Sequence, residues 1–521
     1  MPRDTFKIRP VGIIDRRGIV TTIQDTNVLS RENLMVIGQS EKERYVKKVS
    51  GTRRYNATSV GSYPVVSMAR YLSKTITKSF FFSGGSVYYI DPNGNTTQLS
   101  PVGGLGVFDQ NAIPVFIGMR VSGSDILYFI EGINTGMYSY DGNIGNAFTK
   151  EIAVTLNFVD AVEYLDRMFA FEEDSEDLYF SKNLDPTNFT DSSDAGVITI
   201  GARRGSKNQK LAVLNETLYI FKNDQVYVLE GRTPSEFQVR LVIPDKGLGA
   251  RYSLAKVEGV LVGLMSDFEV WSFSGDNSSM ECLSYNIALG GDYTKEVLSL
   301  IDKNRMTQAR AIYHNFLYRL SFTGTGETQN NWEWCYNTVN KTDFLTHGNR
   351  VASYLPYGGP PDKNELLTGR SDAGIIMYQY DKNLDYDNDA SGATMPIKTK
   401  TKFIGLDSAR NFRVRRMWLN SGVLGGGQIG IKTYIDARNA PSDSTSEQMD
   451  IFGESKSPIT LMKIASQDAI TSRQIPRHNN AKCQSISLEI SEDISNRDFQ
   501  FSSFEIEIIQ KGLKRSRHVG V

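Results

Sequence analysis

The sequence predicts an all-β protein built around a β-propeller of about seven blades. Three observations indicate this fold: strand–turn–strand segments recur along the chain, each second strand carries an aromatic residue, and Gly, Ser, Asp and Asn fill the turns. Of the 521 residues, 40% are hydrophobic, 22% are charged and 11% are aromatic. This composition is typical of a globular chain, and the many aromatic residues favour strands.

The recurring segments each combine an apolar strand, a short polar turn and a second strand. They span residues 79–94, 126–143, 167–185, 217–231, 260–275, 316–337 and 365–381. The aromatic residues on their second strands are Tyr88, Tyr138, Tyr179, Tyr227, Trp271, Trp334 and Tyr378. An average spacing of about 48 residues is typical of propeller blades, because one hairpin cannot bury its apolar face alone. We interpret these aromatic residues as blade core rather than as ligand-binding groups.

The number of blades stays open between about six and eight, because the N-terminal segment is able to complete the last blade. A longer interval before Trp334 contains residues 290–310, whose apolar residues recur at near-helical spacing. This spacing predicts the one helix of the protein.

Four segments are expected along the chain. Residues 1–58 are polar and broken by charged pairs, which predicts an extended N-terminal arm that packs only when a neighbouring subunit supplies a surface. Residues 59–392 hold the propeller. Residues 393–513 contain longer strands with alternating apolar residues, which predict a C-terminal antiparallel β-sandwich, and residues 514–521 form a basic tail.

Charge and cysteine content exclude several classes of protein. The 58 basic and 59 acidic residues give a net charge of −1, so we expect no bulk attraction to nucleic acid or to an anionic membrane. Three distant Cys residues indicate neither a disulfide framework nor a zinc pair. No apolar run approaches the ~18 residues of a membrane span, and the N-terminus lacks the apolar core of a signal peptide. We expect a soluble chain made in a cytoplasm.

The sequence offers no catalytic constellation. Its four His residues form no zinc motif, and neither a phosphate-binding loop nor a nucleophile elbow is present. The stretch GLGARYS, residues 247–253, begins like a dinucleotide-binding loop, but Tyr252 occupies the third Gly position. We therefore expect a Gly-rich turn that enters a strand, and neither catalytic residues nor a cofactor.

One acidic stretch partly matches a calcium loop. Asp385, Asp387 and Asp389 alternate as in the first half of such a loop, but Pro396 stands where the bidentate Glu is required. The favoured interpretation is a solvated acidic loop between domains, with a weak calcium site as the alternative.

Arginine pairs are more prominent than carboxylate pairs. Arg53 and Arg54 lie in GTRRYN. Arg203 and Arg204 lie in GARRGSKNQK, which also contains Lys207 and Lys210. Such clusters are most often solvated faces or ion-pair partners, and the balanced charge agrees with this. The alternative is contact with phosphates without readout of base sequence, which makes the four arginines candidate DNA-facing residues.

Five stretches together resemble a known family. They are GTRRYN at the end of the arm and residues 166–189, 210–238, 247–275 and 401–419. On these stretches the chain resembles the tail-nozzle, or packaged-DNA stabilisation, β-propeller proteins that close the head-to-tail junction of tailed bacteriophages, particularly short-tailed ones.

The resemblance implies a structural virion protein without catalytic activity, located in the phage tail after assembly in the cytoplasm of the host bacterium. It implies a ring, commonly of six copies, below a portal–adaptor complex or tail-tube ring, with tail fibre or spike proteins as further partners. Double-stranded DNA would be retained in the ring and then leave through its channel, bound without sequence specificity. A near-neutral protein suits such a conduit, because each phosphate neutralised by Lys or Arg adds affinity.

Two other classes of function stay open. One is a glycan-cleaving propeller enzyme with two carboxylates at its axial mouth, and the other is a glycan-binding tail module. The repeated S-x-D-x-G-x-x-W boxes of sialidase-like propellers are absent, and SDAGIIMY, residues 371–378, matches such a box only in part. Ring formation would favour the structural protein, polysaccharide cleavage the enzyme, and glycan binding by a monomer the binding module.

Overall fold

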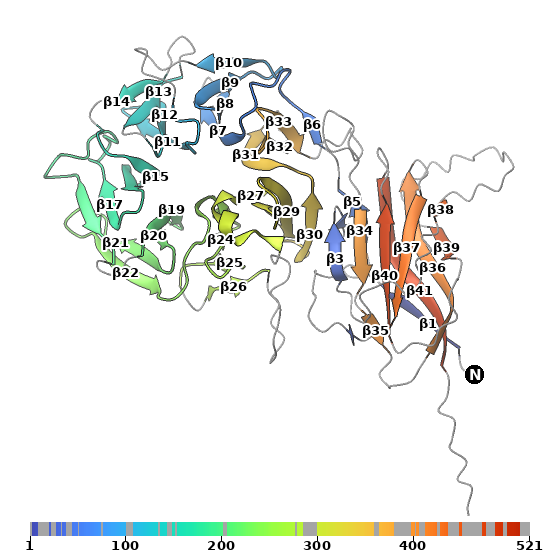
Figure 1. The fold of residues 1–521 in the computed structure, drawn as a ribbon. Helices are drawn as coiled ribbons and strands as arrows, with labels where there is room; N and C mark the ends of the chain where they lie inside the picture. Colours follow the sequence, from blue (N-terminus) through green and yellow to red (C-terminus); the bar gives the residue numbers. More distant parts are fainter. Residues whose placement is uncertain are drawn as a thin grey trace, which may run out of the picture.

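The computed structural model is a seven-bladed β-propeller with a second all-β unit beside it (Figure 1). The sequence left between about six and eight blades open, and the structure has seven. The structure describes residues 3–510 except for 9–19, 22–27, 33, 38–43, 50–51, 74–76, 100–107, 134–135, 143–147, 152–153, 202–205, 277–278, 285–299, 359–363, 380–396, 402, 406–411, 425–427, 436–447, 451–470, 476–484 and 493–497.

Blades 1 to 5 are each built from four consecutive antiparallel strands. Blade 1 contains β7 (Val65–Leu72), β8 (Thr77–Ser83), β9 (Ser86–Ile90) and β10 (Thr96–Leu99). Blade 2 contains β11 (Val115–Val121), β12 (Ser124–Ile130), β13 (Met137–Tyr140) and β14 (Thr149–Glu151). Blade 3 contains β15 (Phe158–Tyr164), β16 (Arg167–Glu172), β17 (Asp177–Phe180) and β18 (Gly196–Thr199). Blade 4 contains β19 (Asn208–Leu214), β20 (Thr217–Lys222), β21 (Val226–Glu230) and β22 (Gln238–Ile243). Blade 5 contains β23 (Ala255–Val257), β24 (Val260–Leu264), β25 (Val270–Phe273) and β26 (Glu281–Cys282).

Blades 6 and 7 depend on strands from other parts of the chain. Blade 6 contains β27 (Arg310–His314), β28 (Leu317–Thr323), β29 (Asn330–Asn337) and β30 (Thr342–His347). Blade 7 contains β31 (Val351–Gly358), β32 (Asn364–Arg370) and β33 (Ile376–Gln379), and its fourth strand is β6 (Thr52–Arg54). β6 pairs antiparallel with β33, so the N-terminal segment closes the propeller.

The predicted aromatic positions are confirmed by the strand order. Tyr88, Tyr138, Tyr179, Tyr227, Trp271, Trp334 and Tyr378 lie on the third strands β9, β13, β17, β21, β25, β29 and β33. Their burial varies: Tyr138, Tyr227 and Trp334 are buried, and Tyr88, Tyr179, Trp271 and Tyr378 are half-buried. The third strand carries the aromatic residue because its side chains fill the widening space between neighbouring blades.

Apolar layers join neighbouring blades. Between blades 1 and 2, Phe80 and Phe82 of β8 pack with Phe129 of β12 and Phe148. Equivalent clusters join blades 2 to 3, 3 to 4, 4 to 5, 5 to 6 and 7 to 1. Each blade thus buries on its neighbours the faces that it cannot bury alone.

Helical structure is scarce in the part of the chain that the structure describes. Residues 303–308 form the 3-10 helix η4 (Lys303–Gln308), and η1 (Arg251–Ser253) is a second short 3-10 helix. Residues 290–299 of the predicted helix lie outside the described residues. Among the described residues, no helix has the length and apolarity needed to cross a membrane.

The second unit is a β-sandwich in which strands from both ends of the chain mix. One sheet has the order β39-β36-β41-β5-β4, with β1 also on β41, and the other contains β2-β35-β40-β34-β3, with β37 on β40. The N-terminal strands are β1 (Arg3–Ile8), β2 (Val20–Thr21), β3 (Val28–Glu32), β4 (Leu34–Ile37) and β5 (Tyr45–Lys48). The C-terminal strands are β34 (Ile397–Thr401), β35 (Phe403–Gly405), β36 (Phe412–Leu424), β37 (Gln428–Ile435), β38 (Gln448–Asp450), β39 (Thr471–Ile475), β40 (Ser485–Glu492) and β41 (Asp498–Gln510).

The N-terminal strands differ from the expected arm, because they pair within their own chain. β1 and β5 pair with β41, β3 pairs with β34, and β3 also meets β30 of blade 6. The second sheet therefore runs from the sandwich into blade 6, as Figure 1 shows where β30, β3 and β34 lie side by side. The physical reason is that open strand edges of the sandwich and of blade 6 supply the hydrogen-bonding groups that an unpaired arm lacks.

Candidate functional site at the axial mouth

The first strand of each blade faces the propeller axis. β31 contacts β7, β7 contacts β11, β11 contacts β15, and β15 contacts β19 around the centre (Figure 1). Between blades 4 and 5 the short helix η1 takes part in this ring, since it contacts both β19 and β27. The axial mouth is defined here as the end of the axis where the first strands begin, with η1 and the residues that surround it.

Local hydrogen bonds fix the position of η1. The hydroxyl of Ser253 donates to Ala250 O (2.7 Å) and accepts from the N–H of Leu264 (3.0 Å). The buried hydroxyl of Tyr318, on blade 6, donates to Ser253 O (2.8 Å). A Cβ at Gly249 would lie 2.7 Å from Met265 O, so only glycine allows the chain to approach β24 this closely before the helix begins.

Tyr252 extends from η1 across the mouth. Its hydroxyl donates to Ile113 O (3.3 Å), in the segment that leads into blade 2. Two cations lie over its ring: Arg310 of blade 6 at 4.3 Å and Lys210 of blade 4 at 5.9 Å from the ring centroid. One side chain therefore connects residues of blades 2, 4 and 6, which closes this end of the propeller axis.

Two ion pairs occupy the rest of the mouth. Arg251 Nη1 and Nη2 donate to the carboxylate of Glu173 (2.8 and 3.0 Å), a bidentate arrangement. The completely buried Asp160 accepts from Lys210 Nζ and from the N–H of Leu211 (2.8 Å). Both carboxylates are thus engaged by cations, and neither stands free as a general acid or base.

Arg310 has no carboxylate partner among the described residues. Its Nη1 donates to Ala309 O (3.0 Å) and Thr307 O (3.2 Å). Burial lowers the pKa of Arg310 to about 10, although the nearby Tyr252 raises it and Arg251 lowers it further. The guanidinium still carries its charge at neutral pH. Arg310 therefore adds a fixed positive charge to the axial mouth.

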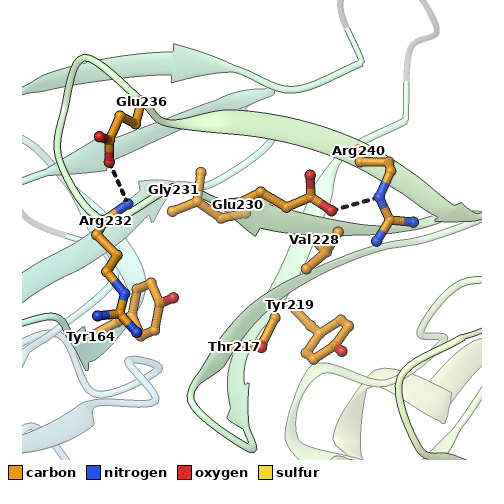
Figure 2. A pocket seen from close by; sticks show the side chains of 10 residues that line it. Tyr164, Thr217, Tyr219, Val228, Glu230, Gly231, Arg232, Glu236 and Arg240 are labelled. Carbon is orange, nitrogen blue, oxygen red and sulfur yellow. Dashed lines mark hydrogen bonds and ion pairs between the residues drawn. The ribbon is translucent and has the colours of Figure 1, made fainter.

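A shallow cleft of about 450 Å³ lies between blades 3 and 4, at the face where the first strands end. Figure 2 shows Arg232 beside the ring of Tyr164 and the ion pair between Glu230 and Arg240 (2.6 Å). The carboxylate of Glu236 accepts from the backbone N–H of Arg232 (3.3 Å). Both carboxylates of this cleft are therefore also occupied, and its polar rim suits weak recognition better than catalysis.

The candidate DNA-facing residues lie elsewhere. Arg53 and Arg54 are on β6, the fourth strand of blade 7, and thus at the rim of the propeller. Arg53 lies over the ring of Tyr378 (5.2 Å), and Arg54 Nε donates to Asn56 O (2.9 Å). Arg203 and Arg204 lie outside the described residues.

The weak calcium candidates Asp385, Asp387 and Asp389 also lie outside the described residues. In the part of the chain that the structure describes, no group of three or more His, Cys, Asp or Glu side chains is placed to hold a metal ion.

Sequence reasoning named Tyr252 and Lys210 but did not bring the residues of the axial mouth together. GLGARYS was interpreted as a turn that enters a strand, which agrees with η1 preceding β23, but the reach of Tyr252 was not foreseen. One signal in the sequence could have pointed to these residues. GLGARYS, residues 247–253, is longer than the turn needed to connect two blades, and it carries an Arg and a Tyr.

Comparisons with known proteins assign neither a family nor a role to this chain. No family model and no curated protein matches the sequence. Among solved structures, virginiamycin B lyase from Staphylococcus aureus is 10% identical, with a TM-score of 0.40 over 63% of this chain and 97% of that chain. The extracellular domain of a one-component system from B. thetaiotaomicron is 10% identical, with a TM-score of 0.42 over 84% and 60%. PorZ, a surface component of the type-IX secretion system of Porphyromonas gingivalis, is 12% identical, with a TM-score of 0.37 over 69% and 44%.

Proposed function

We propose that this chain is a structural protein of a bacteriophage tail, in the nozzle or hub position, and not an enzyme. Copies of it form a ring, six in number, that continues the DNA channel below the portal–adaptor or tail-tube ring. The ring retains packaged DNA and conducts it at ejection. The sequence resemblance supplies the phage assignment, and the occupied axial mouth is the structural observation that favours a building block over an enzyme.

The closed axis bears on where DNA would pass. Tyr252 bridges residues of blades 2, 4 and 6, so a duplex does not pass through the axis of one propeller. In this proposal the channel lies between neighbouring subunits of the ring. Arg53 and Arg54, at the rim of blade 7, stay candidate channel residues together with Arg203 and Arg204.

The sandwich suits the stacking role. It continues the sheet of blade 6 through β3, so a force applied to one unit is carried to the other by backbone hydrogen bonds. A subunit whose two units share one sheet suits a place in a stacked ring. In the virion, the partners would be the ring above, the tail fibre or spike proteins, and double-stranded DNA without sequence specificity.

The mass of the purified protein in solution, followed by class-averaged electron images, tests this proposal. We expect a closed ring with a hole wide enough for duplex DNA. In assembled particles, Arg53→Glu with Arg54→Glu should alter DNA retention or ejection, whereas Arg240→Glu, a matched surface change in the cleft of blade 4, should not. A monomer that cleaves a surface polysaccharide would overturn the proposal.

A second candidate function is glycan binding by the tail. The cleft between blades 3 and 4 favours it, because Tyr164 and Tyr219 line it together with Arg232 and the Glu230–Arg240 pair (Figure 2). Planar polar groups beside aromatic side chains suit sugar hydroxyls. Retention of the protein on immobilised host polysaccharide, abolished by Tyr164→Ala, would favour this function over the conduit.

A further inference from the structure

The axial mouth holds a buried cation whose charge is not balanced. Arg310 begins β27 and is only 8% exposed. Its Nη1 contacts two backbone carbonyls, but its buried Nε has no hydrogen-bond partner. A guanidinium has five donors, and burying it without an anion is costly.

The surrounding side chains add positive charge. Lys210 lies over the same Tyr252 ring as Arg310, and Arg251, next to Tyr252 in the sequence, lies over the ring of Phe171 (5.7 Å). Among the described residues, Glu173 and Asp160 are the carboxylates that pair with these cations. The mouth therefore carries one excess positive charge. Arg251 Nε is also buried without a hydrogen-bond partner, which gives the mouth two orphaned donors.

The mouth is reached from solvent on the side of Glu173. The side chain of Glu173 is 54% exposed, that of Lys210 is 20% exposed and that of Arg251 is 12% exposed. Exposure therefore falls from Glu173 at the surface to Arg310, which is buried. A small ion fits such an approach, whereas the backbone of a duplex is too broad to bring a phosphate to an arginine this deeply buried.

We propose that the axial mouth binds one small oxyanion, of the phosphate or carboxylate class, between Arg310 and Arg251 beside Tyr252. The planar fork of an arginine matches two oxygens of such an anion, and charge-assisted hydrogen bonds of this kind are the strong ones. The anion satisfies the two orphaned Nε donors and removes the excess charge. It thereby ties blade 6 to the connection between blades 4 and 5 and holds the axis closed. This site does not depend on the proposed tail function.

Thermal unfolding of the full chain in inorganic phosphate tests the site, with chloride at matched ionic strength as the reference. A ligand that binds only the folded state raises its stability, so about 10 mM phosphate should raise the unfolding midpoint by about 2 °C or more. An acetate arm at the same ionic strength distinguishes the carboxylate source from the phosphate source. Arg310→Met should lose the increase, whereas Arg240→Gln, at an exposed ion pair, should keep it.

Several results would overturn this assignment. One is a wild-type unfolding midpoint that is the same in phosphate and in acetate as in chloride. Another is an increase of the midpoint in phosphate that is as large in Arg310→Met as in the wild type. If Arg310→Met does not fold, Arg310→Lys takes its place, because it keeps the charge, lacks the Nε donor and should show less than half of the increase. A duplex oligonucleotide that removes the phosphate effect would show that the mouth is a nucleic-acid contact instead.

Discussion

Blades 1 to 5 and blades 6 and 7 are assembled in different ways. Each of the first five is a continuous piece of chain whose four strands follow one another. Blade 7 takes β6 from the N-terminal segment, and blade 6 continues through β3 into the sandwich. The difference shows where the ends of the chain act: they close the propeller and fix the second unit to it.

The layer between blades 6 and 7 also differs in chemistry. The fully buried Glu333 of blade 6 accepts from Tyr354 of blade 7 (2.8 Å) and from Arg319 (3.5 Å). Ser321 and Asn330 of blade 6 both donate to Val351 O (2.7 and 3.0 Å). Directional hydrogen bonds constrain the relative position of blades 6 and 7 more closely than an apolar layer does.

Removal of β6 should have the largest effect. A chain that lacks residues 1–58 exposes the edge of β33, whereas a chain that lacks residues 1–51 keeps β6 and its pairing with β33. We expect limited proteolysis to release a stable propeller fragment from the second chain but not from the first. Equal resistance of the two propellers would show that β6 is dispensable for closure.

Breaking the polar layer should come next. Arg319→Met leaves the carboxylate of Glu333 buried without its cation, and this should cost about 3–5 kcal/mol of unfolding free energy. Arg240→Gln, which breaks the exposed pair with Glu230, is the control and should cost about 1 kcal/mol or less. Denaturant unfolding measures both, and similar costs would contradict a special role of the layer between blades 6 and 7.

Asn56 should be the most sensitive single residue of the closing segment. It is 1% exposed, its Nδ2 donates to Thr58 O (2.8 Å) and Gly374 O (3.0 Å), and its Oδ1 accepts from the N–H of Ile376 (2.9 Å). Asn56→Ala should cost about 2–3 kcal/mol, because it leaves buried backbone groups without partners. The exposed Asn95, which donates to Asp91, serves as the control, and its change to Ala should cost about 1 kcal/mol or less. Equal unfolding midpoints in urea for the two variants would be inconsistent with closure through Asn56.

The smallest expected effect depends on pH. Burial alone would raise the pKa of Asp372, but hydrogen bonds from Arg370 and Arg350 outweigh it and hold this pKa below its ordinary value of 3.8. A carboxylate whose pKa is depressed in the folded state stabilises that state above pH 3.8, and the stabilisation is lost as the pH falls through the folded pKa.

Asp372→Asn should therefore cost about 1–2 kcal/mol at pH 7 and progressively less in acid. Urea unfolding of the wild type and the variant at several pH values measures this difference. A cost that is the same at pH 7 and at pH 3 would mean that the charge of Asp372 does not contribute.

The repeated strand–turn–strand segments were visible in the sequence because each blade packs against its two neighbours in the same way. The third-strand aromatic residues, such as Trp334, are local, periodic signals, and so are the Gly- and Asp-rich turns. Completion of the last blade by the N-terminal segment was left open by the sequence, and the structure confirms it. The exact pairing was not readable, since the three-residue strand β6 pairs with β33 more than 300 residues away. Residues 59–392 were expected to hold the whole propeller, and β6 lies before them.

The axial mouth was out of reach for the same reason. Asp160, Lys210, Tyr252 and Arg310 come from four separate stretches, and nothing in the spacing of these residues says that they meet. The polar character of residues 1–58 predicted an extended arm that packs only against a neighbouring subunit. Polar strands can still pair along sheet edges of their own chain, where backbone groups and not side chains make the bonds.

Hydrogen exchange of the purified chain, before any assembly, tests most directly whether the two chain ends complete the propeller and the sandwich. We expect the amides of β4, β5 and β6 to exchange as slowly as those of β33 and β41, because all of them are paired in one subunit. The contrary result is exchange of these amides within seconds in the isolated chain, with protection only in an assembled ring. It would contradict this account and show that the N-terminal segment is an arm that pairs only with a neighbouring subunit.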